Sequence, residues 1–203
     1  MMAKLNVREK ILTAGFERLH RHGFNGSGVQ DITDAAQVPK GSFYNHFESK
    51  EALGAAALDR YWQLTERGLQ VLSNERTAPL ERLKSYFQSL ADLMRSWDYT
   101  KGCMVGNFGT ELADHSRLIR DRLAMILAAW SRAIESCIRE AQAAGAIETD
   151  LDAATLAAFL LNSWEGAVLR SKIDKDGKAQ QQFLSVVFST ILRPRRTSRR
   201  NEK

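Results

Sequence analysis

The 203-residue sequence has few cysteines, few prolines and no long apolar run, and each shortage excludes a class of protein. Two cysteines cannot form a disulfide framework in a chain of this length, and they suit a reducing compartment. The longest uninterrupted apolar run, Leu123–Trp130, has eight residues, whereas a membrane-spanning helix needs about 18. The first ten residues, MMAKLNVREK, contain charge and no apolar signal region. We therefore expect a cytoplasmic protein.

The composition is that of an ordinary globular protein, with 44% hydrophobic and 26% charged residues, which excludes wholesale disorder and a collagen-like chain. The net charge of +5 invites a nucleic-acid interpretation, but the charge is unevenly placed. Residues 193–203 hold six Lys and Arg and one acid, which leaves 23 basic and 23 acidic residues before them. The basic balance therefore belongs to a predicted disordered tail, which either attracts DNA without sequence preference or only keeps the chain soluble.

The three prolines leave long stretches uninterrupted, and apolar residues recur in them at helical spacing, with no strand pattern. We therefore predict an all-α fold of about nine helices. The predicted helices are 7–22, 29–36, 40–46, 49–69, 79–97, 102–113, 116–144, 153–172 and 178–192. Ser49 is predicted to cap one of them at the N-terminus, and either Asp152 or the pair Thr149 and Asp150 before it to cap another. Gly23 and Gly145 are predicted to end two others.

The stretch from residue 23 to residue 53 has the pattern of a helix-turn-helix. Two short helices, 29–36 and 40–46, are joined by a sharp turn at residues 37–39 and follow a longer supporting helix. Ile32, Ala35 and Ala36 have the size and spacing to pack against the second short helix. A helix-turn-helix followed by a larger helical domain is therefore the predicted architecture.

The second short helix has a face suited to the major groove of DNA. Phe43 and Phe47, four residues apart, are predicted to face inward. The residues left on the outside are small at the N-terminal end and hydrogen-bonding further on: Lys40, Gly41, Ser42, Tyr44, Asn45 and His46. A single Lys or Ser would read as an ordinary solvated residue, but the set as a whole favours contact with phosphates and base edges.

This stretch resembles the DNA-binding motif of the tetracycline-repressor (TetR) family of bacterial regulators. The motif V-x-x-G-x-x-Y-x-H-F-x-x-K-x-x-L is supplied by Val38, Gly41, Tyr44, His46, Phe47, Lys50 and Leu53. Two positions depart from the family pattern: Gly28 stands where Ser or Thr usually caps the helix, and Thr33 stands where Ala is usual. Each departure is expected to alter phosphate contacts at most.

The resemblance implies roles for particular residues. Contact with base edges or the groove is implied for Lys40, Gly41, Ser42 and Asn45, and phosphate contact for Gln30, Tyr44, His46 and Lys50. A packing role for His46 stays open, while a metal or catalytic role has no second His or Cys at ligand spacing to support it. No metal ion and no cofactor are expected, and double-stranded palindromic DNA is the implied partner.

The resemblance also implies three segments: a DNA-binding domain at residues 1–48, an effector-binding and dimerisation domain at 49–192, and the tail at 193–203. The segment 153–172 is apolar nearly all round, and the last helix carries a continuous apolar stripe from Phe183 to Leu192. These two helices from each chain would form the four-helix interface of a homodimer. The alternative is that they close the core of a monomer.

An effector site is predicted from the aromatic residues and one cysteine. Trp62, Trp97, Trp130, Trp164, Met104 and Phe108 are spread over several helices and either line an apolar cavity or form core. Cys103 stands at the start of a short helix beside Lys101, and both features favour the reactive thiolate. Cys137 shares a helical face with apolar residues and reads as inert core.

The segment KGCMVGNF…ELAD resembles a TetR subgroup that includes the repressor of N-ethylmaleimide reductase and the acrylate-responsive repressor. The resemblance implies that Cys103 detects electrophiles or oxidants and that Lys172 faces the thiol. Three hypotheses remain: a repressor released by a small electrophile or oxidant, the same repressor with a non-covalent apolar or carboxylate inducer, and a helical enzyme or interaction module. Against an enzyme, the sequence shows no paired acids, metal-ligand cluster or nucleophile–base spacing.

Overall fold

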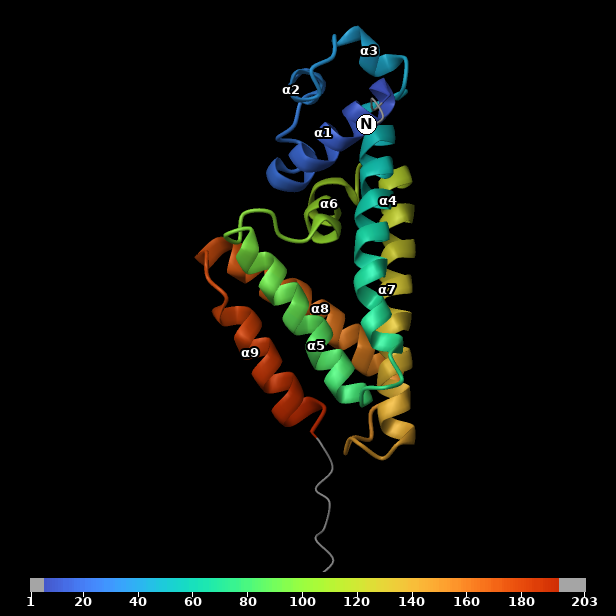
Figure 1. Cartoon of the computed structure of the whole chain (residues 1–203), viewed down its shortest axis with the longest axis vertical. Coiled ribbons are helices and arrows are strands. Elements are labelled where there is room, and N and C mark those ends of the chain that lie inside the picture. The colour runs from blue at the N-terminus through green and yellow to red at the C-terminus, as the bar shows by residue number, and fades with distance from the viewer. Residues whose placement is uncertain (1–5, 194–203) are drawn as a thin grey trace, which may run out of the picture. The chain divides into compact units, whose positions relative to one another are not determined.

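The computed structural model describes residues 6–193, and within that range it contains α-helices but no β-sheet. The helices are α1 (Val7–His22), α2 (Val29–Ala35), α3 (Gly41–Tyr44), α4 (Lys50–Leu69), α5 (Pro79–Ser96), α6 (Met104–Leu112), α7 (Arg117–Ala143), α8 (Ala153–Asp174) and α9 (Lys178–Val186) (Figure 1). A 3-10 turn, Gln70–Ser73, follows α4, and a π turn, Val187–Ile191, follows α9. The predicted all-α fold of about nine helices is confirmed. No helix in the described range is long and apolar enough to cross a membrane.

The ends of the helices are set by short-range hydrogen bonds that the sequence largely predicts. Ser49 Oγ accepts from the N–H of Ala52 at 3.0 Å, so this predicted N-cap is confirmed. Asp152 Oδ1 accepts from the N–H of Thr155 at 2.9 Å, so of the two predicted alternatives Asp152 is the residue that caps α8. Gly23 ends α1 with φ +77°, a backbone conformation that glycine adopts without steric penalty. A cap that was not predicted is Asn6, whose Oδ1 accepts from the N–H of Glu9.

Three predicted helix details were wrong. The helix predicted at 40–46 is only α3, because the backbone tightens after Tyr44 and His46 N–H donates to Phe43 O three residues back. The helix predicted to run unbroken to Leu192 changes to a π turn, in which Leu192 N–H reaches Val187 O at 2.7 Å. Ala35, predicted to pack with its neighbours, is exposed, while Ile32 and Ala36 are buried.

The chain forms two compact units, each built from two separate stretches. The first unit contains the described residues up to Arg67 together with Trp97–Ala129. In it α1 packs against α2, α3 and α6 (Figure 1). Its core includes several side chains with no exposed surface, namely Ile11, Leu19, Ile32, Phe43, Leu53 and Phe108.

The second unit contains Gly68–Ser96 and the described residues from Trp130 onward. Here α9 packs against α5 and α8, and the rings of Phe87, Trp164 and Phe183 meet with centroids 4.9–5.3 Å apart. Arg82, nearly fully buried, donates to Leu72 O and pairs with Glu140, which ties α5 to the 3-10 turn and to α7. The predicted boundary at residue 48 separates a DNA-binding domain from an effector domain, and it stays a prediction about function. It does not coincide with a boundary between these two compact units. Residues 194–203 of the predicted tail lie outside the described residues.

Candidate DNA interface and thiol site

The helix-turn-helix begins at a glycine cap. Gly28 has extended backbone angles and donates its N–H to Asp31 Oδ2 at 2.8 Å, which holds the start of α2 without a side-chain cap. Thr33, the other departure from the family pattern, is fully buried, and its hydroxyl donates to Val29 O and Gln30 O. Thr33 therefore turns toward its own helix and offers nothing to DNA.

The turn between α2 and α3 is tight. Gln37 has φ +55°, and the next N–H, that of Val38, donates to Thr33 O at 3.0 Å. On the inner side of α3, Phe43 and Phe47 are buried as predicted, with ring centroids 5.8 Å apart. The guanidinium of Arg8 lies 5.1 Å from the centre of the Phe47 ring. The inner face thus holds α3 against α1.

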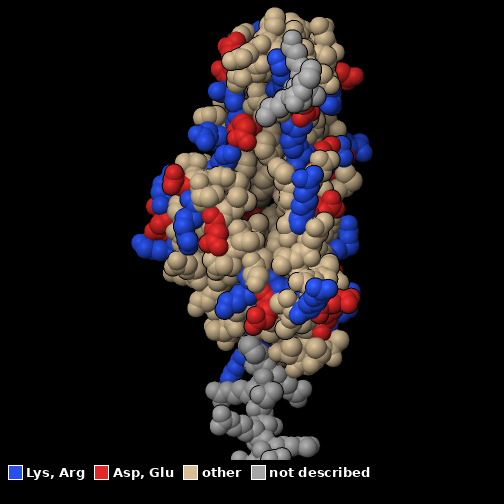
Figure 2. Space-filling view, in the orientation of Figure 1, with Lys and Arg blue, Asp and Glu red and all other residues tan. Residues whose placement is uncertain are grey.

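The outer side of α3 is open. Of the six residues predicted to face DNA, Ser42 is half-buried and the others are exposed: Lys40, Gly41, Tyr44, Asn45 and His46. Tyr44 has 59% of its surface exposed, which is high for an aromatic side chain. A Cβ added at Gly41 would meet nothing within 4 Å, so no contact within the described residues requires glycine there. On the face in view in Figure 2, Lys and Arg alternate with Asp and Glu among the described residues.

Two of the predicted phosphate-contacting residues are engaged within the protein. Gln30 Nε2 donates to Asp34 Oδ1 at 2.7 Å on the exposed side of α2. Lys50 Nζ donates to Phe24 O at 3.0 Å and to Ser27 O at 3.1 Å, and partial burial lowers its pKa while Glu111 opposes that shift. Phosphate contact by these two side chains stays a prediction.

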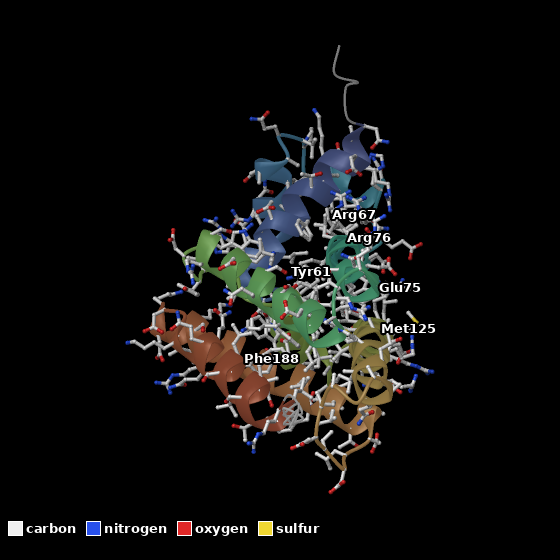
Figure 3. The ribbon with its side chains drawn as sticks, turned by 60° about the horizontal axis from the view of Figure 1, so that its bottom comes forward. Tyr61, Arg67, Glu75, Arg76, Met125 and Phe188 are labelled. Atoms are coloured by element: carbon white, nitrogen blue, oxygen red, sulfur yellow. The ribbon has the colours of Figure 1, made fainter. Side chains whose placement is uncertain are left out.

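Cys103 is the N-cap residue of α6, as predicted, but its side chain is buried, with 6% of the residue exposed. Tyr61, which α4 contributes, is labelled in Figure 3. Its hydroxyl donates to Cys103 Sγ at 3.5 Å. The predicted neighbouring cation, Lys101, is directed elsewhere, since its ammonium donates to Glu17 Oε2 at 2.8 Å and lies 5.2 Å from the centre of the Trp97 ring. One polar partner of this thiol is therefore a phenol.

A buried histidine among aromatic rings contacts Gly102, the residue before Cys103. His20 of α1 is buried, and its Nε2 lies 2.8 Å from Gly102 O. Its ring meets the rings of Tyr61 and Trp97 edge to face, with centroids 5.3 and 5.2 Å away. Neither His20 nor Tyr61 was predicted from the sequence, because each lies more than 40 residues from Cys103 and belongs to no motif.

Cys137 of α7 is core, as predicted. Only 1% of its surface is exposed, and its thiol donates to Pro79 O at 3.2 Å. Burial raises the pKa of Cys137 to about 11, with Arg82 acting in the opposite direction. The two cysteines therefore differ in the groups around them, although both are buried.

The remaining predicted effector residues are divided between the two units. Trp62, Trp97, Met104 and Phe108 belong to the first unit together with Cys103, and Trp130, Trp164 and Lys172 belong to the second. Met104 and Phe108 are fully buried, and Trp130 and Trp164 nearly so. A common effector pocket and a Cys103–Lys172 pair remain predictions. Among residues 6–193, no group of His, Cys, Asp and Glu could hold a metal ion.

The second unit exposes large apolar side chains on two of its helices. Phe159, Leu169 and Ile173 of α8 have 49%, 58% and 67% of their surface exposed, and Val186 of α9 has 52%. Gly166 lies on the same stripe of α8 at helical spacing, and a Cβ added there would meet nothing within 4 Å. Exposed apolar stripes are typical of protein–protein interfaces.

Comparison with known proteins covers both parts of the chain. A family described as "Bacterial regulatory proteins, tetR family" matches residues 11–57, and one described as "Tetracyclin repressor-like, C-terminal domain" matches residues 79–187. The chain is 41% identical over 192 residues to the HTH-type transcriptional repressor DhaR of Mycobacterium sp. (strain GP1), covering 94% of this chain and 95% of DhaR.

A second relative and a solved structure agree with that match. The transcriptional regulator AcuR of Cereibacter sphaeroides is 36% identical over 169 residues, covering 83% of this chain and 77% of AcuR. The crystal structure of E. coli NemR in its reduced form is similar with a TM-score of 0.82 and 26% identity, over 90% of this chain and 95% of that one.

Proposed function

This chain belongs to the TetR family of bacterial transcriptional regulators, and on that premise we propose a homodimer that releases a palindromic operator when a small electrophile or oxidant acts at Cys103. The chain is a DNA-binding repressor by family and not an enzyme. Its DNA target implies a cytoplasmic location. The operator, the dimer and the chemistry of release are the parts that need experiment.

The exposed face of α3 supports the assignment of the DNA-reading residues. Lys40, Gly41, Ser42 and Asn45 would meet base edges or the groove, while Tyr44 and His46 would meet phosphates on either side. The observation that carries this part is Gly41, since its missing side chain serves no contact within the described residues. A glycine on an exposed helix lets another molecule approach the backbone, and in this family that molecule is DNA.

The apolar stripe on α8 and α9 supports a homodimer. Phe159, Gly166, Leu169 and Ile173 follow one another at steps of seven, three and four residues, which places them on one side of α8. The bare backbone at Gly166 would let a second copy of α8 approach closely. A twofold dimer would present two α3 helices about one DNA turn apart, roughly 34–36 Å, so the operator would be a palindrome.

The position of Cys103 supports electrophile sensing. Its thiol lies at the N-terminus of α6, where the helix dipole favours a thiolate, and Tyr61 can donate a hydrogen bond to that thiolate. The thiolate would add to the activated carbon of an electrophile, forming one S–C bond, and the resulting carbanion would take up one proton. The chain is also similar to NemR, of which one solved form is named as reduced.

An oxidant would act at the same atom. Hydrogen peroxide would convert the Cys103 thiol to a sulfenic acid and water, and the amine of Lys172 could then displace water to form an S–N bond. The product would weigh two hydrogens less than the reduced protein. Peptide mass spectrometry after mild peroxide would detect or exclude that Cys103–Lys172 link.

A non-covalent inducer is the second candidate, and the burial of Cys103 favours it. A thiol with 6% exposure reacts only when the surrounding side chains open, whereas a ligand that fits among the aromatic residues needs no reaction. In either mechanism the inducer must favour the arrangement of the DNA-reading helices that does not fit the operator over the one that does. An inducer with equal affinity for both arrangements would shift no equilibrium.

The deciding experiment begins with selection of bound DNA from a random pool, which yields the operator and shows whether it is a palindrome. Operator affinity is then measured before and after N-ethylmaleimide, and separately after hydrogen peroxide followed by dithiothreitol. C103S tests the proposed sensor, and C137S is the matched control at the other cysteine. Size-exclusion chromatography with light scattering, on the parent and on L169E, tests the dimer.

The proposal expects release from the operator by N-ethylmaleimide in the parent and in C137S but not in C103S, and reversal by dithiothreitol only after peroxide. Unchanged release of C103S from the operator by N-ethylmaleimide would refute the thiol mechanism and leave the non-covalent inducer. Absence of any selected DNA sequence would overturn the whole assignment.

A further inference from the structure

The connection between α1 and α2 is held from one side by a single carboxylate of α6. Glu111 Oε1 accepts from the N–H of Phe24 at 3.1 Å, and Oε2 accepts from the N–H of Asn25 at 2.6 Å. A Cβ at Gly23 would collide with Glu111 Oε1, so the carboxylate occupies space that only glycine leaves. Two charge-assisted hydrogen bonds to adjacent N–H groups fix both the position and the direction of this connection.

The opposite side of the same connection is held by a lysine of α4. Lys50 Nζ donates to Phe24 O and Ser27 O and lies 4.1 Å from the centre of the Phe24 ring. The hydroxyl of Ser27 donates in turn to Gly23 O at 2.9 Å. The connection therefore lies between an anion on its N–H side and a cation on its carbonyl side, and α2 begins directly after it.

Glu111 stands on the helix that begins at the thiol. Cys103 caps α6, and Glu111 lies eight residues later, about 12 Å along the helix axis. The chain just before α6 is also attached to α1, since His20 Nε2 lies 2.8 Å from Gly102 O. Near the other end, Phe108 packs edge to face on Phe24 with ring centroids 5.8 Å apart. All these residues belong to the first unit.

We propose that Glu111 is a positioning residue, through which α6 sets the placement of α2 and α3 on DNA and through which a change at Cys103 reaches them. The positioning half depends only on DNA binding, and the coupling half rests on the proposed sensing function. Two states differ in whether the carboxylate holds the Phe24 and Asn25 N–H groups. Modification of Cys103 displaces the start of α6 and favours the released state.

The test compares E111Q and E111A with D114N in the full-length protein. D114N removes the same charge three residues away, from an exposed carboxylate. For each protein, the Kd for the operator selected from random DNA is measured before and after N-ethylmaleimide, together with Tm. The ratio of the two Kd values is the coupling, and a merely structural residue would lower Tm without changing that ratio.

We expect E111Q to weaken operator binding about 10-fold or more before treatment, since it loses a charge-assisted hydrogen bond. The Kd ratio should fall toward 1 in both Glu111 variants, and D114N should match the parent. Parental Kd values and ratio in E111Q would overturn the proposal. If the parent itself is not released by N-ethylmaleimide, the sensing function and the coupling half both fail, while the affinity of E111Q still decides the positioning half.

Hydrogen exchange in the unmutated protein tests the same proposal without a variant. The amides of Phe24 and Asn25 should exchange at least about 10-fold more slowly than free peptide amides, and N-ethylmaleimide should remove that protection. Fast exchange of both amides before treatment would refute a clamp by Glu111. Unchanged protection after release from DNA would refute the coupling.

Discussion

Replacing Gly41 by alanine separates the stability of the protein from its affinity for DNA. The new Cβ would meet nothing within 4 Å, and the residue already has helical backbone angles with φ below zero. Alanine in place of an exposed helical glycine stabilises a protein by up to about 1 kcal/mol, because it restricts the unfolded chain. For a chain of this length, we expect Tm to rise by about 1–4 °C.

The same methyl group should weaken operator binding. If the α3 backbone approaches DNA at Gly41, the methyl must displace one surface or the other, and overpacking of that kind costs about 1–3 kcal/mol. The Kd would then rise roughly 5- to 150-fold at constant salt. Fluorescence anisotropy with the selected operator measures the Kd, and differential scanning calorimetry measures the Tm.

Two other glycines give the controls. A Cβ at Gly68, near the end of α4, would touch only Tyr86 at 4.0 Å, so G68A should leave operator affinity unchanged. A Cβ at Gly15 would lie 2.7 Å from Leu53 Cδ2, so G15A should lower Tm through crowding of the core. If G41A binds the operator as tightly as the parent while G15A behaves as described, close approach of DNA to Gly41 is refuted.

Three further outcomes follow from the charges and thiols. At pH 8 a thiol with a pKa of about 11 is about 0.1% ionised. Cys137 should therefore react with N-ethylmaleimide about 100-fold more slowly than a model thiol of pKa 9, which mass spectrometry can measure. Labelling of Cys137 at the rate of a free thiol would contradict its burial. K50Q should weaken DNA binding without changing its salt dependence if the Lys50 ammonium only holds the connection between α1 and α2. If Lys50 instead contacts a phosphate, K50Q would reduce the slope of log K against log salt by about 0.9. Removal of residues 194–203 should weaken binding to random DNA and flatten its salt dependence, and an unchanged slope would make the tail a solubilising end only.

Most of the fold was predictable because helical periodicity and caps are local. Ser49, Asp152 and Gly23 begin or end helices through contacts within four residues. Ser49 and Gly23 were placed correctly, and Asp152 was one of two alternatives for its helix. The π turn after Val186 was not predictable, because the apolar stripe continues through it unchanged. The short length of α3 was missed because Phe43 and Phe47 keep a helical four-residue spacing across its end.

The surroundings of the thiol were only half predictable. The place of Cys103 at the start of α6 follows from its own neighbours in the chain, but its partner Tyr61 comes from another helix 42 residues away. Lys101 was expected beside the thiol from sequence adjacency, yet an ion pair with Glu17 of α1 directs it elsewhere. Glu111 was part of a recognised motif, and only the fold shows that it reaches Phe24, 87 residues earlier.

The interleaving of the two compact units limits how this regulator can be recombined with others. The chain passes between the units three times, after Arg67, Ser96 and Ala129, so no single crossover point exchanges one unit whole. Consider a chimera in which the segment up to residue 67 comes from another regulator and the rest from this chain. The foreign segment would then pack against an α6 that it did not evolve with, and residue 23 would no longer be matched to Glu111. New operator specificities are therefore better grafted as the few exposed residues of α3 than as an exchanged N-terminal segment.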